Sequence, residues 1–258
     1  LKEWSVLIPS LAEQEKIGEF FQKLDRLIEV NREKLDKLKA SKSAYLTEMF
    51  PREGEDRPRR RFQGFIGVWE EKKLGEVGIT FNGLSGKSKK DFGHGQAEFI
   101  TYLNVFHNTI SDIYGTDNVE IDDRQNQVKY GDIFFTTSSE TPEEVGMSSV
   151  WINNRPNVYL NSFFFGYRLL ESINIYYIAY LLRSPSIRKE FQLLAQGISR
   201  YNISKTKAMD INIPIPSLAE QEKIGNFFQK LDQQIEVQEE KLEKLEKMKK
   251  AYLAEMFV

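Results

Sequence analysis

The feature that most constrains this fold is a long segment that occurs twice in the chain. Residues 8–50 return 207 positions later as residues 215–257, with 32 of the 43 aligned positions identical. Solenoid repeats are shorter, about 20 to 50 residues from one unit to the next. The chain therefore uses one element twice, on either side of a unique insert, and carries an internal pseudo-symmetry.

Each copy of the repeat has the pattern of one long helix. Ser10 and Ser217 stand at N-cap positions, and Glu13 and Glu220 three residues later complete the capping-box pattern. Apolar residues then recur at alternating spacings of four and three, which is typical of a coiled-coil seam. The alternative is a pair of amphipathic helices within an ordinary core.

We predict that the two helices form an antiparallel coiled coil. Its interface comprises Leu24, Ile28, Asn31, Leu35 and Leu38 in the first copy and Leu231, Ile235, Gln238, Leu242 and Leu245 in the second. Asn31 and Gln238 occupy one seam position, and Lys42 and Lys249 another. Polar seam residues reduce stability but fix register and partner. The sequence leaves open whether the helices pair within one chain or between chains.

The pattern changes between the two copies. Residues 51–61 are charged and contain Pro and Gly, which indicates a linker. Its basic run, residues 57–61, is either a solvated stretch or a phosphate contact. Residues 62–214 mix strand-like runs with helical ones: strands over 98–105, 132–137 and 159–169, and helices over 70–77, 173–183 and 187–195.

The predicted fold class is therefore α+β, with one globular α/β domain over residues 62–214. The first repeated helix, residues 8–50, precedes the linker and this domain, and the second, residues 215–258, follows them. Residues 1–7 align under the same offset with residues 208–214. They therefore correspond to the last residues of a domain like the insert.

The insert carries no recognisable catalytic motif. Gly86-Lys87-Ser88 lacks the upstream glycine of a phosphate-binding loop, because Phe81 stands in its place. The two histidines, His94 and His107, form no helical ligand pair, and the chain has no cysteine. We expect a noncatalytic chain with no metal and no cofactor of its own. The lack of cysteine also fits a reducing compartment, and we expect the cytoplasm.

Composition limits the partners. The most apolar stretch, residues 163–182, is interrupted by Arg168, Glu171 and Asn174, so we expect no membrane segment. A formal net charge of -2 argues against nonspecific coating of nucleic acid, which normally uses a surplus of Lys and Arg. Residues 51–214 contain equal numbers of basic and acidic side chains. A positive face must therefore arise from their arrangement in space.

Polar segments of the insert suit contacts with DNA. Arg pairs with guanine edges and Asn with adenine, while hydroxyl and ammonium groups bind phosphates. The alternative for each segment is an ordinary polar loop that binds nothing. The candidate DNA-binding residues are Asn82, Lys87, Lys89 and Lys90; Thr137, Ser138, Ser139 and Thr141; and Arg200, Tyr201 and Asn202.

Taken together, these motifs resemble the specificity subunits of type I restriction-modification systems. The resemblance covers essentially the whole chain and rests on residues 213–224, the helix ending Tyr-Leu-x-Glu-Met-Phe, Phe62-Gln-Gly-Phe65 with Trp69, residues 131–140 and residues 196–205. It implies recognition of double-stranded DNA at a bipartite site. It also implies partners: methyltransferase subunits that bind S-adenosylmethionine, and a translocating endonuclease subunit.

The family pattern alternates two recognition domains with two helices, whereas this sequence has one such domain. We expect a half-subunit, either natural or a fragment. If half-subunits pair as a homodimer, two-fold symmetry predicts an inverted-repeat target with a nonspecific spacer. The main alternative is a coiled-coil scaffold without DNA specificity, and a second is a nuclease whose site the motifs do not reveal. The bases that are read do not follow from sequence.

Overall fold

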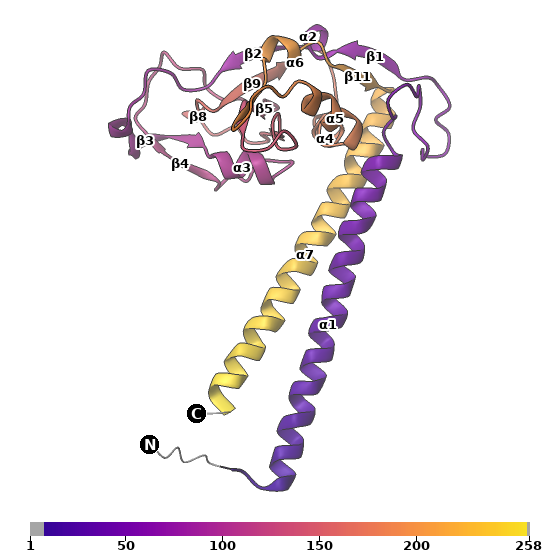
Figure 1. The fold of residues 1–258 in the computed structure, drawn as a ribbon, viewed down its shortest axis with the longest axis vertical. Helices are drawn as coiled ribbons and strands as arrows, with labels where there is room; N and C mark the ends of the chain where they lie inside the picture. The colour runs from indigo at the N-terminus through magenta and orange to yellow at the C-terminus, as the bar shows by residue number, and fades with distance from the viewer. Residues whose placement is uncertain (1–7, 257–258) are drawn as a thin grey trace. The chain divides into compact units, whose positions relative to one another are not determined.

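The structure is a computed structural model that describes residues 8–256 (Figure 1). It divides into two compact units, one of residues 44–229 and one of the described parts of residues 1–43 and 230–258. Residues 1–7 lie outside the described part. Within residues 8–256, no helix has the length and apolar character that a membrane span requires.

The described helices are α1 (Leu11–Glu48), α2 (Leu74–Val77), α3 (Tyr102–His107), α4 (Ile175–Leu181), α5 (Pro185–Leu193), α6 (Lys205–Ala208) and α7 (Leu218–Met256), with one 3-10 turn, η1 (Lys89–Asp91). The described strands are β1 (Glu70–Lys73), β2 (Gly78–Asn82), β3 (Phe92–Ile100), β4 (Thr116–Val119), β5 (Ile133–Thr136), β6 (Ser138–Ser139), β7 (Ser148–Val150), β8 (Val158–Leu160), β9 (Phe164–Leu169), β10 (Tyr201–Asn202) and β11 (Asn212–Ile215). This mixture confirms the predicted α+β fold class.

In the unit of residues 8–43 and 230–256, α1 and α7 run antiparallel and side by side (Figure 1). All ten predicted seam residues are buried or half-buried, and Leu24, Ile28 and Leu245 pack into one cluster. In the seam, the Gln238 side-chain amide donates to the backbone oxygen and Oδ1 of Asn31, each at 3.0 Å. The buried polar layer is thus satisfied, as low-dielectric surroundings require.

The helices begin where the sequence predicted. α1 starts directly after Ser10, whose backbone oxygen accepts from the N–H groups of Glu13 and Gln14, each at 2.9 Å. α7 starts directly after Ser217 in the same way. Half of the predicted capping box at Glu220 forms, because the Glu220 N–H donates to Ser217 Oγ at 3.4 Å. The Glu220 carboxylate accepts from Arg61 instead, at 2.6 and 2.7 Å.

The unit of residues 44–229 is built on a four-stranded antiparallel sheet with the strand order β2-β9-β5-β7. Helices α4 and α5 supply apolar side chains to the main core, where Phe191 stacks on Phe135 at 5.2 Å between ring centroids. A second, three-stranded sheet has the order β4-β3-β8. Phe50 and Phe228, from either side of the insert, stack within the same core at 5.8 Å.

Strands β1 and β11 pair antiparallel, with Glu70 opposite Ile215 and Lys73 opposite Asn212. This pairing brings the start and the end of the insert together. The Tyr177 hydroxyl donates to the Pro214 oxygen at 2.6 Å and locks β11 onto α4. Complete burial raises the pKa of Tyr177, so this hydroxyl keeps its proton as a donor.

Three predicted elements differ from the structure. Residues 70–77 are half strand and half helix, because β1 is needed to pair with β11. The strand expected over 98–105 ends at Ile100 and is followed by α3, whose Asn104 amide holds the oxygens of Asp112 and Gly115 at 2.8 Å. The run 159–169 is two strands, separated by a turn in which Asn161 Oδ1 accepts from the Phe163 N–H at 3.2 Å.

Two arginines, Arg188 buried and Arg183 half-buried, fix the segment between β6 and β7. Arg188 donates to the backbone oxygens of residues 143, 145 and 146 at 2.6 to 2.9 Å. Arg183 donates to Ser148, and also to Val105 and Asn108 near α3. Burial lowers the pKa of Arg183 to about 9, which still leaves the group charged at neutral pH. Backbone carbonyls thus take the place of carboxylates.

The basic run of the linker is neutralised within the chain. Arg57 pairs with Asp56, Arg59 with Glu55, Arg60 with Glu48 and Arg61 with Glu220. Only the last pair is buried, with side-chain exposures of 15% for Arg61 and 1% for Glu220. The sequence anticipated solvated or phosphate-bound arginines. The structure shows intramolecular ion pairs, of which one belongs to the interior.

This difference in burial yields the first prediction. We expect Arg61→Ala to lower the free energy of unfolding by about 3 kcal/mol, because it leaves the buried Glu220 carboxylate without its partner. Arg59→Ala is the matched control and removes an exposed pair worth about 0.5 kcal/mol. Urea unfolding of the two variants measures both values. Equal losses would show that the Arg61–Glu220 pair adds nothing through its burial.

Candidate nucleic-acid interface

The polar segments singled out in the sequence leave one end of the four-stranded sheet. Asn82, the last residue of β2, lies opposite Phe165 of β9. Phe164, the first residue of β9, lies opposite Thr136, the last residue of β5. The segments that follow Asn82 and Thr136 therefore start at the same end of the sheet, on either side of β9.

The third segment joins them through a short strand. In the β6–β10 pair, Ser139 lies opposite Tyr201 and Ser138 opposite Asn202. Beyond β10, the Lys205 ammonium group donates to Asn82 Oδ1 at 2.9 Å. The structure thus brings together three segments that are far apart in the sequence.

The predicted DNA-binding residues differ in accessibility. Ser139 is buried and its hydroxyl donates to Glu144 at 2.8 Å, while the Thr137 hydroxyl donates to the Phe163 oxygen at 2.8 Å. Ser138, Thr137, Tyr201 and Lys87 are half-buried. The side chains that face solvent are those of Asn82, Lys89, Lys90, Thr141, Arg200 and Asn202.

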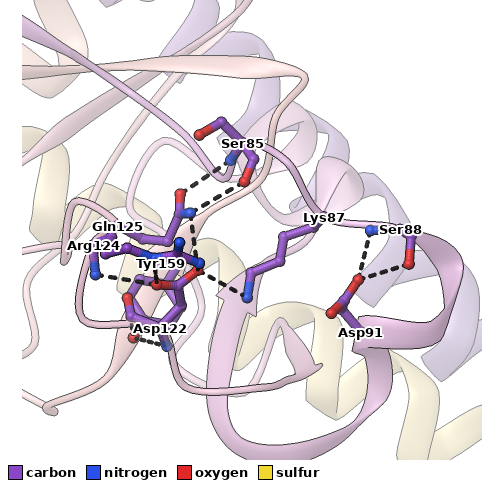
Figure 2. Close-up of polar contacts among 8 residues, drawn as sticks. All are labelled: Ser85, Lys87, Ser88, Asp91, Asp122, Arg124, Gln125 and Tyr159. Atoms are coloured by element: carbon purple, nitrogen blue, oxygen red, sulfur yellow. Dashed lines mark hydrogen bonds and ion pairs between the residues drawn. The ribbon is translucent and has the colours of Figure 1, made fainter.

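Lys87 anchors its own loop (Figure 2). Its ammonium group lies 3.2 Å from Asp122, and the two side chains are only 11% and 9% exposed. Asp122 also accepts from Arg124 at 2.9 and 3.0 Å and from Gln125 at 3.3 Å. These hydrogen bonds, Arg124 first, hold the pKa of Asp122 well below its usual range. Lys87 is therefore the internal counterion of this cluster.

Further contacts hold the rest of the loop. Ser85 and Gln125 exchange two hydrogen bonds of 3.0 and 3.1 Å, and Asp91 accepts from the backbone and hydroxyl of Ser88 at 2.6 and 2.8 Å (Figure 2). At Gly83 a Cβ would lie 2.2 Å from the Asn161 oxygen, so no larger residue fits. Lys89 and Lys90 thus sit on a loop with a fixed path.

Most of the unpaired positive charge in residues 51–214 lies on these three segments or directly after them in the sequence. Of the basic side chains in residues 51–214, all of which the structure describes, most form ion pairs or are buried against backbone oxygens. Those that do neither are Arg52, Lys89, Lys90, Lys129, Arg200, Lys205 and Lys207. Five of these seven lie in η1 or between Arg200 and Lys207. The arrangement is what phosphate binding needs.

Sequence reasoning left Lys205 and Lys207 out of the candidate site. They lie on α6, which is capped by Ser204 and begins only three residues after β10 ends. Their position in the sequence, shortly after the polar segment that ends at Asn202, could have identified both lysines as candidates.

A hollow of about 360 Å³ opens beside these segments. Its apolar part comes from α3 and the β8–β9 turn, and its polar part from β6, the segment that follows β6, and Arg200. The lining residues are Tyr102, Leu103, Phe106, His107, Phe163, Ser138, Ser139, Glu140, Glu144 and Arg200. Guanidinium and carboxylate groups can read guanine and cytosine edges, and apolar side chains can contact a thymine methyl group.

The aromatic wall of the hollow is pre-formed. Tyr102 stacks between Phe106 and Phe164 at centroid distances of 5.8 and 5.7 Å, and its hydroxyl donates to the Ser138 oxygen at 3.2 Å. The sequence missed this wall because α3 had been assigned to a strand. Among residues 8–256, no group of three or more metal-ligating side chains is close enough to hold a metal ion.

Comparison with known proteins assigns this arrangement to a family. A family model described as "Type I restriction modification DNA specificity domain" matches residues 67–247. The HsdS subunit from Thermoanaerobacter tengcongensis has a similar structure, with a TM-score of 0.61 and 21% identity over 97% of this chain and 59% of that one. A second structure is described in terms of complex assembly and conformational transition of the type I R-M system. It has a TM-score of 0.65 and 20% identity over 97% of this chain and 60% of that one.

The S subunit from M. genitalium is more distant, with a TM-score of 0.50 and 16% identity over 95% of this chain and 58% of that one. At such identities the structural likeness shows the fold alone. The chain spans about six-tenths of the length of the solved proteins that it resembles.

The cluster around Asp122 generates the second prediction. Asp122→Asn removes the carboxylate that Lys87 and Arg124 share, so we expect faster amide hydrogen exchange at residues 85–91. Asp123→Asn, at the exposed neighbouring position, is the matched control. Because the pKa of Asp122 is lowered in the folded chain, its stabilisation is present above the ordinary Asp pKa and is lost as pH falls through the lowered value. Unchanged exchange in Asp122→Asn would exclude the anchoring role.

Proposed function

This chain belongs to the family of type I restriction-modification DNA specificity domains, and from that premise we propose that it selects the double-stranded DNA sequence on which a type I complex acts. The observation that carries the proposal is that most unpaired lysine and arginine side chains of residues 51–214 lie on, or directly after, three segments that meet at one end of the four-stranded sheet. Folding leaves these cations available where most others are paired.

Two kinds of contact are proposed for this surface. Lys89, Lys90 and Lys207 bind phosphates, which sets affinity and orientation without sequence information. Arg200, Asn202 and Glu140 lie at or beside the hollow and read base edges. Ser139 and Lys87 support the surface from within, since their polar groups already have partners. In this proposal, residues with internal partners hold the surface in place, and exposed side chains make the contacts with DNA.

The chemistry is assigned to partners. In this proposal the chain carries no catalytic step, methyltransferase subunits bind S-adenosylmethionine and modify the DNA, and an endonuclease subunit cleaves it. The family membership supports these roles, and the cytoplasm is the compartment in which such a complex would meet DNA. The specificity chain contributes the choice of site.

The repeat supports a bipartite site. Glu220, Gln221, Ile224 and Phe228 of α7 are buried in the unit that contains the recognition domain. Their equivalents in α1, Glu13, Gln14, Ile17 and Phe21, are identical in sequence but exposed or half-buried. We propose that this second set receives another recognition domain. In a homodimer of such chains that domain comes from the second copy.

Selection from a random DNA duplex library tests the function. The chain is mixed with its methyltransferase partner, and the retained duplexes are sequenced. An enriched inverted repeat with a fixed spacer is the expected result, because two identical recognition domains would read two identical half-sites. A single short half-site would support DNA reading but not the homodimer. No enrichment at all would overturn the proposed function.

Individual side chains provide a finer prediction. Arg200→Ala should weaken specific binding by about 1 to 3 kcal/mol and relax the preference at one base pair. Lys207→Ala should weaken binding to all sequences and reduce the salt slope by about 1. Lys189→Ala, which breaks an ion pair with Glu53 elsewhere in the same unit, is the control and should change neither quantity. Binding isotherms at several salt concentrations separate these effects, and identical isotherms for all three variants would remove Arg200 and Lys207 from the site.

A further inference from the structure

The two copies of the repeat differ at eleven aligned positions, and only two differences reverse the sign of a charge. Arg32 in the first copy corresponds to Glu239 in the second, and Lys39 corresponds to Glu246. Both first-copy residues are positive and both second-copy residues are negative. The rest of the repeat keeps the sign of every charge that both copies carry.

The structure joins these four residues across the coiled coil. Arg32 lies 2.6 Å from Glu246, and Lys39 lies 2.6 Å from Glu239. The two ion pairs are equivalent under the pseudo-symmetry, because exchanging the copies converts one into the other. Two independent contacts thus carry the same polarity, with α1 positive and α7 negative.

A second set of ion pairs serves as an internal reference. Lys42 lies 2.5 Å from Asp232, and its symmetry equivalent, Lys249, lies 2.5 Å from Asp25. Here both copies carry the same residues, Asp followed by Lys. These contacts would therefore form equally well if α1 met α7, if α1 met a second α1, or if α7 met a second α7. They hold the helices together without distinguishing between partners.

The sign-reversed positions do distinguish. If two α1 helices paired in the same register, Lys39 of each would face Arg32 of the other. If two α7 helices paired, Glu239 of each would face Glu246 of the other. Each arrangement replaces two attractive contacts by two repulsive ones, whereas pairing of α1 with α7 satisfies both. Charges that flank a coiled-coil seam are known to set partner choice in this way.

We propose that Arg32, Lys39, Glu239 and Glu246 form a pairing code that directs α1 onto α7 and excludes the pairing of like helices between copies. A second copy of this chain can then join it only by exchanging helices, α1 of one copy onto α7 of the other, or through other faces. The proposal concerns assembly and does not depend on whether the insert reads DNA.

The size of the effect suits a code rather than a source of stability. The four side chains are about half exposed, and an exposed ion pair contributes about 0.2 to 1 kcal/mol. The free-energy difference between the correct and the wrong pairing is larger than the contribution of one ion pair, because two attractions become two repulsions of similar size in the wrong pairing. Like-charge contacts thus act on the competing assembly, while the common seam supplies the apolar burial.

The absence of cysteine from the chain allows a direct test with full-length protein. Asn31 lies against its own repeat equivalent, Gln238, so pairing of two α1 helices would place residue 31 against residue 31 of the second copy. Asn31→Cys is therefore a reporter of that pairing. The reporter chain, with and without Arg32→Glu, is unfolded, refolded in a glutathione buffer and examined for disulfide-linked dimers.

Arg32→Glu makes two α1 helices complementary at both positions and removes the ion pair with Glu246. We expect about a tenfold rise in linked dimer over the reporter alone, which corresponds to about 1.4 kcal/mol. Lys37→Glu changes the net charge equally at an exposed position that pairs only along α1 with Glu33, and should leave the yield unchanged. Equal yields in all three proteins, including none, or an equal rise in Lys37→Glu, would overturn the code.

A second reporter guards against a folding defect in α1. Gln238→Cys reports the pairing of two α7 helices, and Glu246→Lys makes that pairing complementary at both positions. The linked-dimer yield should rise in this pair of proteins as well. Helix content from circular dichroism checks that each variant is folded. A folded Glu246→Lys variant with no more dimer than its reporter would count against the proposal as strongly as the first result.

Discussion

The requirement that the insert begin and end at one place governs the rest of this structure. An antiparallel return of α7 beside α1 is possible only if the chain that leaves the first helix comes back to where it left. The pairing of β1 with β11 meets this requirement, and the Tyr177 hydroxyl fastens the last residue of the insert to α4. Aromatic side chains from both flanks, Phe50 and Phe228, then share one core with the insert. Closure of the insert and packing of its core therefore share residues, since Tyr177 takes part in both.

The sequence allowed prediction of whatever depends on short-range periodicity. The four-three spacing located the helices and the seam, and Ser10 and Ser217 located their first turns within a residue. Contacts between residues far apart in the chain did not follow. Arg61 and Glu220 are 159 positions apart, and nothing near either residue distinguishes this buried pair from the exposed pairs of the same arginine run. The helix predicted over residues 70–77 was wrong for the same reason, since pairing with a distant strand decides the conformation of residues 70–73.

The candidate site shows the same division. Sequence reasoning could name the polar segments because residue types such as Arg, Asn and Lys carry their chemistry with them. It could not show that Ser138 lies opposite Asn202, that Lys205 contacts Asn82, or that Asp122 neutralises Lys87. These contacts show why equal numbers of basic and acidic residues do not imply an evenly neutral surface. Ion pairs elsewhere in the domain take up many of its acidic residues, so a chain with a net charge of -2 can still present unpaired cations near the candidate site.

The repeat separates what two identical segments share from what makes them different. Identical residues serve functions common to both copies, as the seam and the Lys42–Asp232 and Lys249–Asp25 ion pairs do. Identity also makes the copies interchangeable, and interchangeable helices can pair with the wrong copy. The sign-reversed positions break this equivalence where the helices meet. A repeated element can thus keep its packing unchanged and acquire direction from a few surface charges, because repulsion in the wrong assembly costs the correct one nothing.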